Sequence, residues 1–446
     1  MIKVGLIVPK GSKYGKNQYL AEFLRENDIV SNFYGAWETP NLSLLTVAGL
    51  FPEEYELKFV DEDHGEEIPF KTDFELVFVT AMTQQIIRAY EICDKFHEMG
   101  VYTVIGGIHA TIYPEEAMQH ADTILSGEGE NTVRRFLEDY KNGCAKELYC
   151  SEGFIDLTTS PVPRYDLLNP KLYKSYSIQT TRGCPRSCSY CTLPVMYGGK
   201  YRSKTVEQVL NEIHAIKKVD QHPFIFFADD NMFINKKNAI QLLMELEKED
   251  IVWGTQTDLT VAQDPEILSL LKKAGCRWLF IGFENISEGS LELLDRKKFK
   301  ADLSKQYSEL IAKIHEAGVF IWGSFMFGTD DDNEQTFEDV LDFVVKNSLY
   351  SCSFTILTPL PGTEMFEKMK KDNRILDYDW SRYTFWDIVF KTKNMAPETL
   401  ARKVAWIYEN FYSEKNSANR LSAIRRQLKK SREKGRTKNE NGANIT

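Results

Sequence analysis

The sequence lacks any apolar run of the roughly 18 residues that a membrane span requires. It has no leader pattern either, because Ile2 to Val8 already read as a strand. Eight cysteines in 446 residues are too few for a disulfide scaffold and indicate a reducing compartment. We therefore expect a cytoplasmic protein of two or three domains with free thiols.

Acidic residues outnumber basic ones except near the C-terminus. The net charge is −10, but residues 420–440 hold nine Lys and Arg against two Glu, a local charge of +7 that leaves −17 on the rest. An acidic body argues against nucleic acid as the main partner. We expect residues 431–446 to form a disordered basic tail. The spacing of Leu421, Ile424 and Leu428 among basic residues fits a helix in peripheral contact with an anionic membrane, or simply a solvated helix end.

Residues 1–142 alternate strand-like and helix-like segments, which predicts a doubly wound, parallel α/β sheet. Ligands bind such sheets at the carboxyl ends of the strands. The segments at those ends contain Thr83, Gly107, His109, Gly127 and Glu128, which we take as candidate ligand contacts. The expected strands are 2–8, 56–60, 76–80, 102–105 and 123–125, and the expected helices are 42–50, 84–99, 114–120 and 131–140.

A second α/β alternation follows a proline-containing connector at 143–174. Six β/α units predict a partial barrel over 175–363, since a full barrel needs eight. The remaining 364–430 form a mainly helical C-terminal region. The expected barrel strands are 175–181, 224–228, 251–257, 278–283, 319–327 and 353–357, and the expected helices are 206–219, 237–249, 265–274, 303–317 and 334–347.

Three cysteines stand close together directly after the first barrel strand. Cys184, Cys188 and Cys191 have C-x3-C-x2-C spacing. Three thiolates on one short loop can ligate three irons of a cubane and leave the fourth iron open. A structural zinc would want four closed ligands, and no second cysteine pair lies near. Inert core thiols are the other alternative, but Gly, Pro and Ser between the cysteines disfavour a core.

This motif, with Tyr190 before its last cysteine, resembles the signature of the radical S-adenosylmethionine (SAM) enzymes. The resemblance implies a [4Fe–4S] cluster on Cys184, Cys188 and Cys191 whose open iron binds SAM. Reductive cleavage of SAM then yields a 5′-deoxyadenosyl radical that removes a hydrogen atom from an unreactive carbon. It also implies a reducing electron donor such as flavodoxin or ferredoxin.

By the same resemblance, further loops of the barrel would contact SAM. Asp229 and Asp230 end the second barrel strand and would orient the SAM amino group, although such residues also cap helices. Glu284 ends the fourth strand, where it would face SAM or substrate, or remain a solvated rim acid. Ser324 lies in the segment expected to meet the adenosine. Tyr190 completes the set, and no catalytic residue is predicted.

The first domain resembles the flavodoxin-like cobalamin-binding domain that precedes the barrel in one large radical SAM class. The matching segments include 40–45, 60–62, 106–109 and 127–130. The D-x-H-x-x-G motif that supplies a histidine to cobalt in methionine synthase is absent after the first strand. A domain that binds no cobalamin is therefore the alternative.

The order of segments most resembles the branch that contains the hopanoid methylases. This resemblance implies C-methylation of an unactivated carbon of a small-molecule or lipid substrate. The aromatic stretch from Asp377 to Trp386 would either wall an apolar channel that suits an isoprenoid or serve only as a packing clamp against the barrel. Two other functions stay open: a radical cyclisation, oxidation or rearrangement without methyl transfer, and a non-enzymatic cobalamin or SAM sensor.

Overall fold

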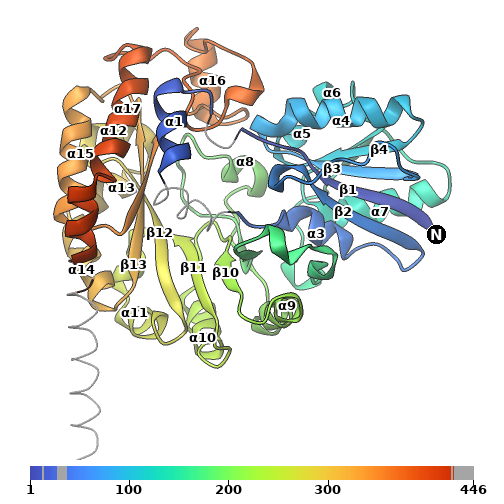
Figure 1. The fold of residues 1–446 in the computed structure, drawn as a ribbon, viewed down its shortest axis with the longest axis horizontal. Helices are drawn as coiled ribbons and strands as arrows, with labels where there is room; N and C mark the ends of the chain where they lie inside the picture. The colour runs from blue at the N-terminus through green and yellow to red at the C-terminus, as the bar shows by residue number, and fades with distance from the viewer. Residues whose placement is uncertain (13–14, 28–37, 423–424, 426–446) are drawn as a thin grey trace, which may run out of the picture.

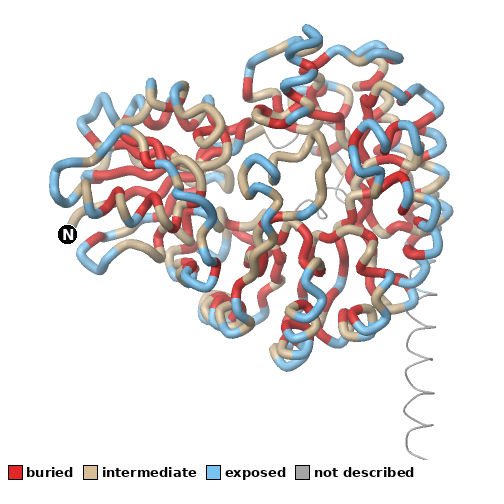
Figure 2. The backbone as a smooth tube through the Cα atoms, turned by 180° about the vertical axis from the view of Figure 1, so that it is seen from behind, coloured by how far each residue is buried: buried red, intermediate tan, exposed pale blue. Residues whose placement is uncertain are grey.

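Two α/β lobes lie side by side in this computed structural model, which describes residues 1–12, 15–27, 38–422 and 425 (Figure 1). One lobe is built on the first six strands, and we call it the N-terminal domain. The other is built on strands β7 and β10–β14, and we call it the barrel. Buried segments run through both lobes, and exposed segments gather at the loops and outer helices (Figure 2).

The N-terminal domain has a parallel sheet with the strand order β2-β1-β3-β4-β5-β6. The first five strands have the flavodoxin-like order, so the predicted fold class is confirmed. The sixth strand was not predicted: it lies within the expected connector and pairs with β5. The strands are β1 Ile2–Val8, β2 Tyr55–Asp61, β3 Leu76–Thr80, β4 Tyr102–Gly106, β5 Thr123–Ser126 and β6 Leu148–Cys150. The helices are α3 Leu42–Ala48, α4 Ile86–Glu98, α5 Ile108–Ile112, α6 Pro114–Ala117 and α7 Gly129–Lys141.

Helix α1, Gln18–Glu26, was also not predicted, and it leaves its own domain. It lies beside α17, Pro397–Phe411, on the barrel side of the molecule (Figure 1). The ring centroids of Phe23 and Tyr408 are 6.4 Å apart, and the Tyr19 hydroxyl donates to Glu398 Oε1 at 3.1 Å. The chain therefore joins the two lobes near its beginning as well as through the connector.

The barrel is an open parallel sheet of six strands with the order β14-β13-β12-β11-β10-β7. This arrangement confirms the predicted partial barrel. The strands are β7 Tyr176–Ile178, β10 Phe224–Phe227, β11 Val252–Thr257, β12 Cys276–Glu284, β13 Phe320–Phe327 and β14 Ser351–Ile356. The helices after them are α8 Leu193–Tyr197, α9 Val206–Val219, α10 Lys236–Leu246, α11 Pro265–Leu271, α12 Glu288–Leu294, α13 Phe299–Ser304, α14 Tyr307–Glu316, α15 Glu334–Lys346 and α16 Glu364–Lys371.

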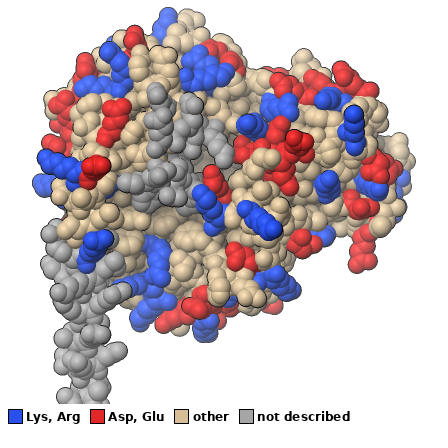
Figure 3. Space-filling view, viewed as in Figure 1, with Lys and Arg blue, Asp and Glu red and all other residues tan. Residues whose placement is uncertain are grey.

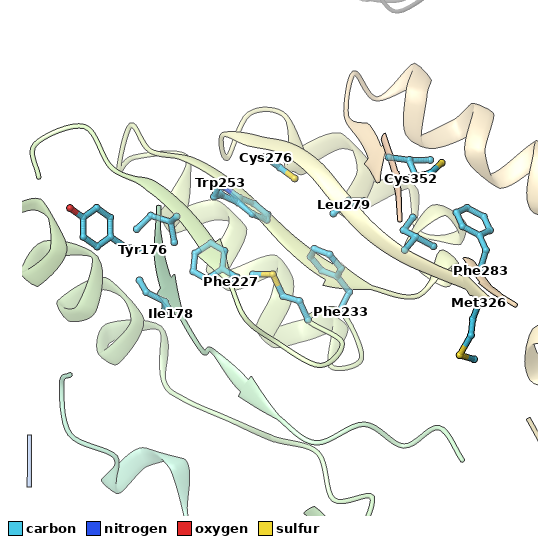
Figure 4. Close-up of a cluster of buried hydrophobic side chains, with 14 of the residues drawn as sticks. Tyr176, Ile178, Phe227, Phe233, Trp253, Cys276, Leu279, Phe283, Met326 and Cys352 are labelled. Carbon is cyan, nitrogen blue, oxygen red and sulfur yellow. The ribbon is translucent and has the colours of Figure 1, made fainter. Parts of the chain in front are cut away.

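The two faces of the barrel sheet carry different side chains. Alternate residues of the strands pack under the outer helices, and Figure 4 shows Phe227, Trp253 and Leu279 in this core. The opposite face lines the lumen. There the ring centroid of Trp278 lies 5.6 Å from that of Phe226, on which it stacks, and 5.7 Å from that of Trp322. Trp278 and Trp322 lie near the amino ends of β12 and β13, away from the carboxyl ends at which α/β proteins bind ligands.

The aromatic stretch 377–386 packs against the N-terminal domain. Trp380 and Tyr383 are buried in the core of that domain, and the Trp380 ring lies 5.2 Å from the imidazole of His109. The stretch also contacts the barrel, because the Phe385 carbonyl accepts the amide of Ile356 in β14 at 2.7 Å, so it packs between the two lobes. A sequence rich in aromatic residues indicates that the rings are buried but does not identify the surface against which they pack.

The predicted basic tail 431–446 and most of the predicted membrane-contacting helix lie outside the described residues. Of the described residues in this region, Leu421 is exposed and Arg420 is buried. The Arg420 guanidinium carbon lies 3.8 Å from the centroid of the Phe411 ring. Among the described residues, we find no helix with the length and hydropathy of a membrane span. Basic and acidic side chains are intermixed over the face shown in Figure 3.

Candidate functional site

The three cysteines lie on a loop that a short hairpin closes. Strand β8, Thr181–Arg182, pairs antiparallel with β9, Arg202–Ser203, so that Arg182 is directly opposite Arg202. We call residues 183–201 the cysteine loop and the two paired strands its neck. Because the neck follows β7, it stands at the carboxyl edge of the barrel sheet, where ligands of α/β proteins bind.

Two adjacent carboxylates after β10 hold the start of the neck. Asp229 accepts hydrogen bonds from the amides of Thr180 and Thr181 at 2.7 and 2.6 Å, and from the Thr180 hydroxyl at 2.7 Å. Asp230 Oδ2 accepts the amide of Gly183 at 2.7 Å. Burial raises the pKa of Asp229 to about 6 and raises the pKa of Asp230. The Asp229 carboxylate is thus engaged by the backbone rather than aimed at the lumen, and its predicted contact with SAM stays a prediction.

The cysteine thiols fit an iron–sulfur cluster. All three are free and half-buried, and burial, with a smaller contribution from the other two thiols, raises the pKa of Cys191 to about 12. Burial likewise raises the pKa values of Cys184 and Cys188, so a bound metal has to displace protons from the thiols. Within the described part of the chain, no three such side chains converge on a point as the ligands of one ion do. Three thiolates on one loop would each bind a different iron of a cubane.

Glu284 and Tyr190 meet beside the cysteines, together with Lys300, which the sequence did not single out. Lys300 Nζ donates to Glu284 Oε1 at 2.6 Å and to the Gly282 carbonyl at 2.9 Å. Burial is the main reason that the pKa of Tyr190 is raised, and the Glu284 carboxylate adds to it. Glu284 has φ of +66°, a conformation that costs a residue with a side chain roughly 1–3 kcal/mol. The Lys300 ammonium holds the carboxylate in this strained position.

Ser324 lies on the lumen side of β13, level with Gly282 on one side and Ser353 on the other. Gly282 and Ser324 are small residues that follow Trp278 and Trp322 toward the carboxyl ends of the same strands. A Cβ on Gly282 would overlap the Glu284 carboxylate and come within 3.3 Å of Lys300 Nζ. The lumen therefore has an apolar floor and, near the cysteine loop, a polar rim.

The carboxyl edge of the N-terminal sheet has glycines where a ligand would need close approach to the backbone. Gly107 has φ of +104°, and a Cβ there would lie 2.6 Å from the Ala81 carbonyl oxygen. Gly127 has φ of +89°. Thr83 is buried just beyond β3. A cavity of about 680 Å³, partly lined by the loop after β2, opens at the same edge. None of Thr83, Gly107 and Gly127 lines this cavity, and a Cβ on either glycine would meet protein atoms, so their contact with cobalamin stays a prediction.

His109 and Glu128 come from the same edge, but their side chains have partners within the protein. His109 is buried, its Nε2 lies 3.3 Å from Glu116 Oε1, and burial lowers its pKa. Glu128 accepts hydrogen bonds from Arg182 and Arg202 at the neck. Contact of either side chain with cobalamin stays a prediction.

Family comparisons agree with both lobes. Residues 178–344 match the model of the radical SAM superfamily, and residues 15–137 match that of the B12 binding domain. The chain is 31% identical over 402 residues to the bacteriochlorophyllide d C-12(1)-methyltransferase of Chlorobaculum tepidum, a match that covers 88% of this chain and 85% of that protein. The chain belongs to the radical SAM enzymes with a B12-binding domain.

Other members of this class are similar over most of the chain. The hopanoid C-2 methylase of Rhodopseudomonas palustris is 26% identical over 353 residues, which cover 76% of this radical SAM enzyme and 66% of the methylase. A solved structure of OxsB, a cobalamin-dependent SAM radical enzyme with aqua-cobalamin and SAM bound, superposes with a TM-score of 0.70. That match has 16% identity and covers 97% of this chain and 72% of OxsB, so it shows the fold alone.

Both family matches bear on the cofactors. The radical SAM and B12-binding domains establish a [4Fe–4S] cluster, SAM and cobalamin as the cofactors of this enzyme, as the sequence predicted. The cysteine loop and the loops at the carboxyl edges of the two sheets are where these groups would bind. The predicted alternative of a domain that binds no cobalamin is therefore disfavoured.

Several site residues escaped the sequence reasoning. Arg186, inside the motif, pairs with Asp258 at 2.7 Å and lies 3.5 Å from the Phe299 ring centroid. Lys300 ends a basic run that reads as solvated surface. Both residues are basic, but a sequence alone does not show which carboxylate a basic side chain pairs with in the fold.

We expect Lys300→Met to cost roughly 3–5 kcal/mol of unfolding free energy, because it leaves the Glu284 carboxylate buried without a cation. Chemical denaturation of the purified protein measures this. The matched control is Lys298→Met two residues away, whose partner Glu292 is exposed, so little change is expected. Equal losses in the two variants would contradict the role given to Lys300.

Proposed function

We propose that this enzyme methylates an unactivated carbon of an apolar small molecule. One observation carries the proposal: loops at the carboxyl edges of the two sheets touch. Glu128, after β5, pairs with Arg182 of the neck, and Gly362, after β14, lies against Ile112 of α5. Methyl transfer from cobalamin to a substrate radical needs both cofactors at one cavity, and contacting edges meet that need.

The roles proposed for individual residues follow from their places. Cys184, Cys188 and Cys191 would hold the cluster, and Tyr190, Asp230, Glu284 and Ser324 would surround SAM, with Asp229 acting through the neck. Thr83, Gly107 and Gly127 would lie against cobalamin, and His109 and Glu128 would support that edge. When bound, these groups supply hydrogen abstraction and a transferable methyl group. The protein's part is to orient the substrate and exclude water.

The class of substrate rests on the relatives, because the rings of Trp278, Trp322 and Phe226 in the lumen pack together and are almost fully buried. The two methylating relatives act on a bacteriochlorophyllide and on hopanoids, both largely apolar. We propose an isoprenoid, lipid or pigment-like substrate. Flavodoxin or ferredoxin would serve as electron donor, in the cytoplasm, with peripheral membrane contact through the basic C-terminal segment and without nucleic acid.

An anaerobic assay with SAM labelled in its methyl group tests the proposal. The full chain is reconstituted with iron, sulfide and hydroxocobalamin, reduced, and given lipid and pigment fractions separately. We expect 5′-deoxyadenosine together with label in one apolar product. If 5′-deoxyadenosine formed and the product gained no labelled methyl, cyclisation, oxidation or rearrangement would replace methylation. No 5′-deoxyadenosine under strong reductant would indicate a sensor. Label in a hydrophilic product alone would overturn the substrate class.

A further inference from the structure

Glu128 of the N-terminal domain reaches across to the barrel. Its Oε1 accepts a hydrogen bond from Arg182 Nη1 at 2.6 Å, and both of its oxygens lie 2.9 Å from Arg202 Nη1. Its Oε2 also accepts the amide of Ile155 at 2.9 Å. The side chain is 3% exposed, so solvent screens these contacts little. One buried carboxylate thus binds both strands of the neck.

Glu130 completes the contact from the first turn of α7. Its Oε1 accepts hydrogen bonds from Arg182 Nη2 at 3.0 Å and from the Ser160 hydroxyl at 3.1 Å. Its Oε2 accepts one from Arg182 Nη1 at 3.3 Å. Its side chain is 7% exposed. A planar guanidinium is therefore held by two carboxylates, an arrangement that fixes direction as well as distance.

Arg182 and Arg202, the partners of these carboxylates, lie where the cysteine loop begins and ends. Arg182 and Arg202 are cross-strand neighbours, and every residue between them belongs to the cysteine loop. Arg182 is followed immediately by Gly183 and Cys184. The barrel fixes the neck from its own side through Asp229 and Asp230, whose partners are backbone amides. The arginine side chains of the neck, in contrast, are paired with carboxylates of the N-terminal domain.

We infer that Glu128 and Glu130 are positioning residues for the iron–sulfur cluster. By clamping the neck, the N-terminal domain sets where the cysteine loop stands relative to the edge that binds cobalamin. The clamp fixes the spacing of the two cofactors by direct ion pairs rather than through the connector alone. This inference rests on the cofactor set of the proposed function and is independent of methyl transfer or substrate.

The test compares cofactor spectra of the full chain carrying Glu128→Gln together with Glu130→Gln. Both changes keep side-chain shape and remove charge. We expect cobalamin retained after gel filtration at the wild-type ratio, because Thr83, Gly107 and Gly127 are untouched and both carboxylates are turned to the arginines of the neck. We expect SAM affinity, read from the change that SAM makes in the EPR signal of the reduced cluster, to weaken roughly 10- to 100-fold, as for other groups that orient metal ligands.

The control is Glu54→Gln, which removes an exposed pair with Lys141 in the same domain and should change neither spectrum. An unaltered SAM response in the double variant would overturn the clamp. Loss of cobalamin with a normal SAM response would overturn it in favour of a direct cobalamin contact. Loss of both cofactors would also overturn it, since it would show a role in the fold at large. None of these readouts requires methyl transfer, so failure of the proposed function would leave the test intact.

Discussion

Replacing Cys184, Cys188 or Cys191 singly by Ala is expected to abolish the cluster and the cleavage of SAM. Each thiolate holds a different iron, and the loop offers no fourth cysteine to substitute for a lost one. Iron content and visible absorbance after anaerobic reconstitution measure the first loss, and 5′-deoxyadenosine measures the second. We expect both to fall to the level of protein-free controls.

The control for these variants is Cys150→Ala, because Cys150 is exposed on β6 and does not belong to the cysteine loop. It should keep wild-type iron content and SAM cleavage. A loop variant that still formed 5′-deoxyadenosine would remove the basis of the assignment. Chemical denaturation of each variant checks that the fold survives. We expect it to survive because the three thiols lie at the rim of the barrel and outside its core.

The alternation of strands and helices could be predicted because each element buries a regular face. Helix α9 begins and ends where the periodicity placed it, at Val206 and Val219. The expected single helix 303–317 is two helices, because the chain turns after Ser304, whose hydroxyl donates to the Ala301 carbonyl at 2.7 Å. The apolar pattern runs on through the break, since Leu303, Tyr307 and Leu310 are all buried.

The contacts between lobes could not be predicted, because periodicity shows that a face is buried but does not identify the surface against it. Helix α1 packs on α17, almost the whole chain away, and Trp380 packs on His109. For the same reason, Glu128 looked like part of a ligand loop, while its carboxylate lies in an ion pair with the neck. The cysteine motif was readable because all its ligands lie within eight residues.

Gly183→Ala is expected to prevent the cluster from assembling although no ligand is changed. Gly183 has φ of +94°, and its added Cβ would overlap the backbone carbonyl oxygen of Lys200. A backbone oxygen cannot move aside as a flexible side chain can, so the two arms of the cysteine loop would have to separate at the neck. The Gly183 amide would then lose Asp230, and Cys184 would shift with it.

Gly199→Ala separates this clash from the general cost of replacing a glycine. Gly199 has φ of +70°, but its nearest neighbour to an added Cβ is the Cys184 carbonyl oxygen at 4.0 Å. It should therefore lose only the roughly 1–2 kcal/mol of the left-handed conformation and keep the cluster. Iron per chain after reconstitution distinguishes the two: near zero for Gly183→Ala and near wild type for Gly199→Ala. Normal iron in Gly183→Ala would mean that the neck tolerates opening, so its closure would not position the cysteines.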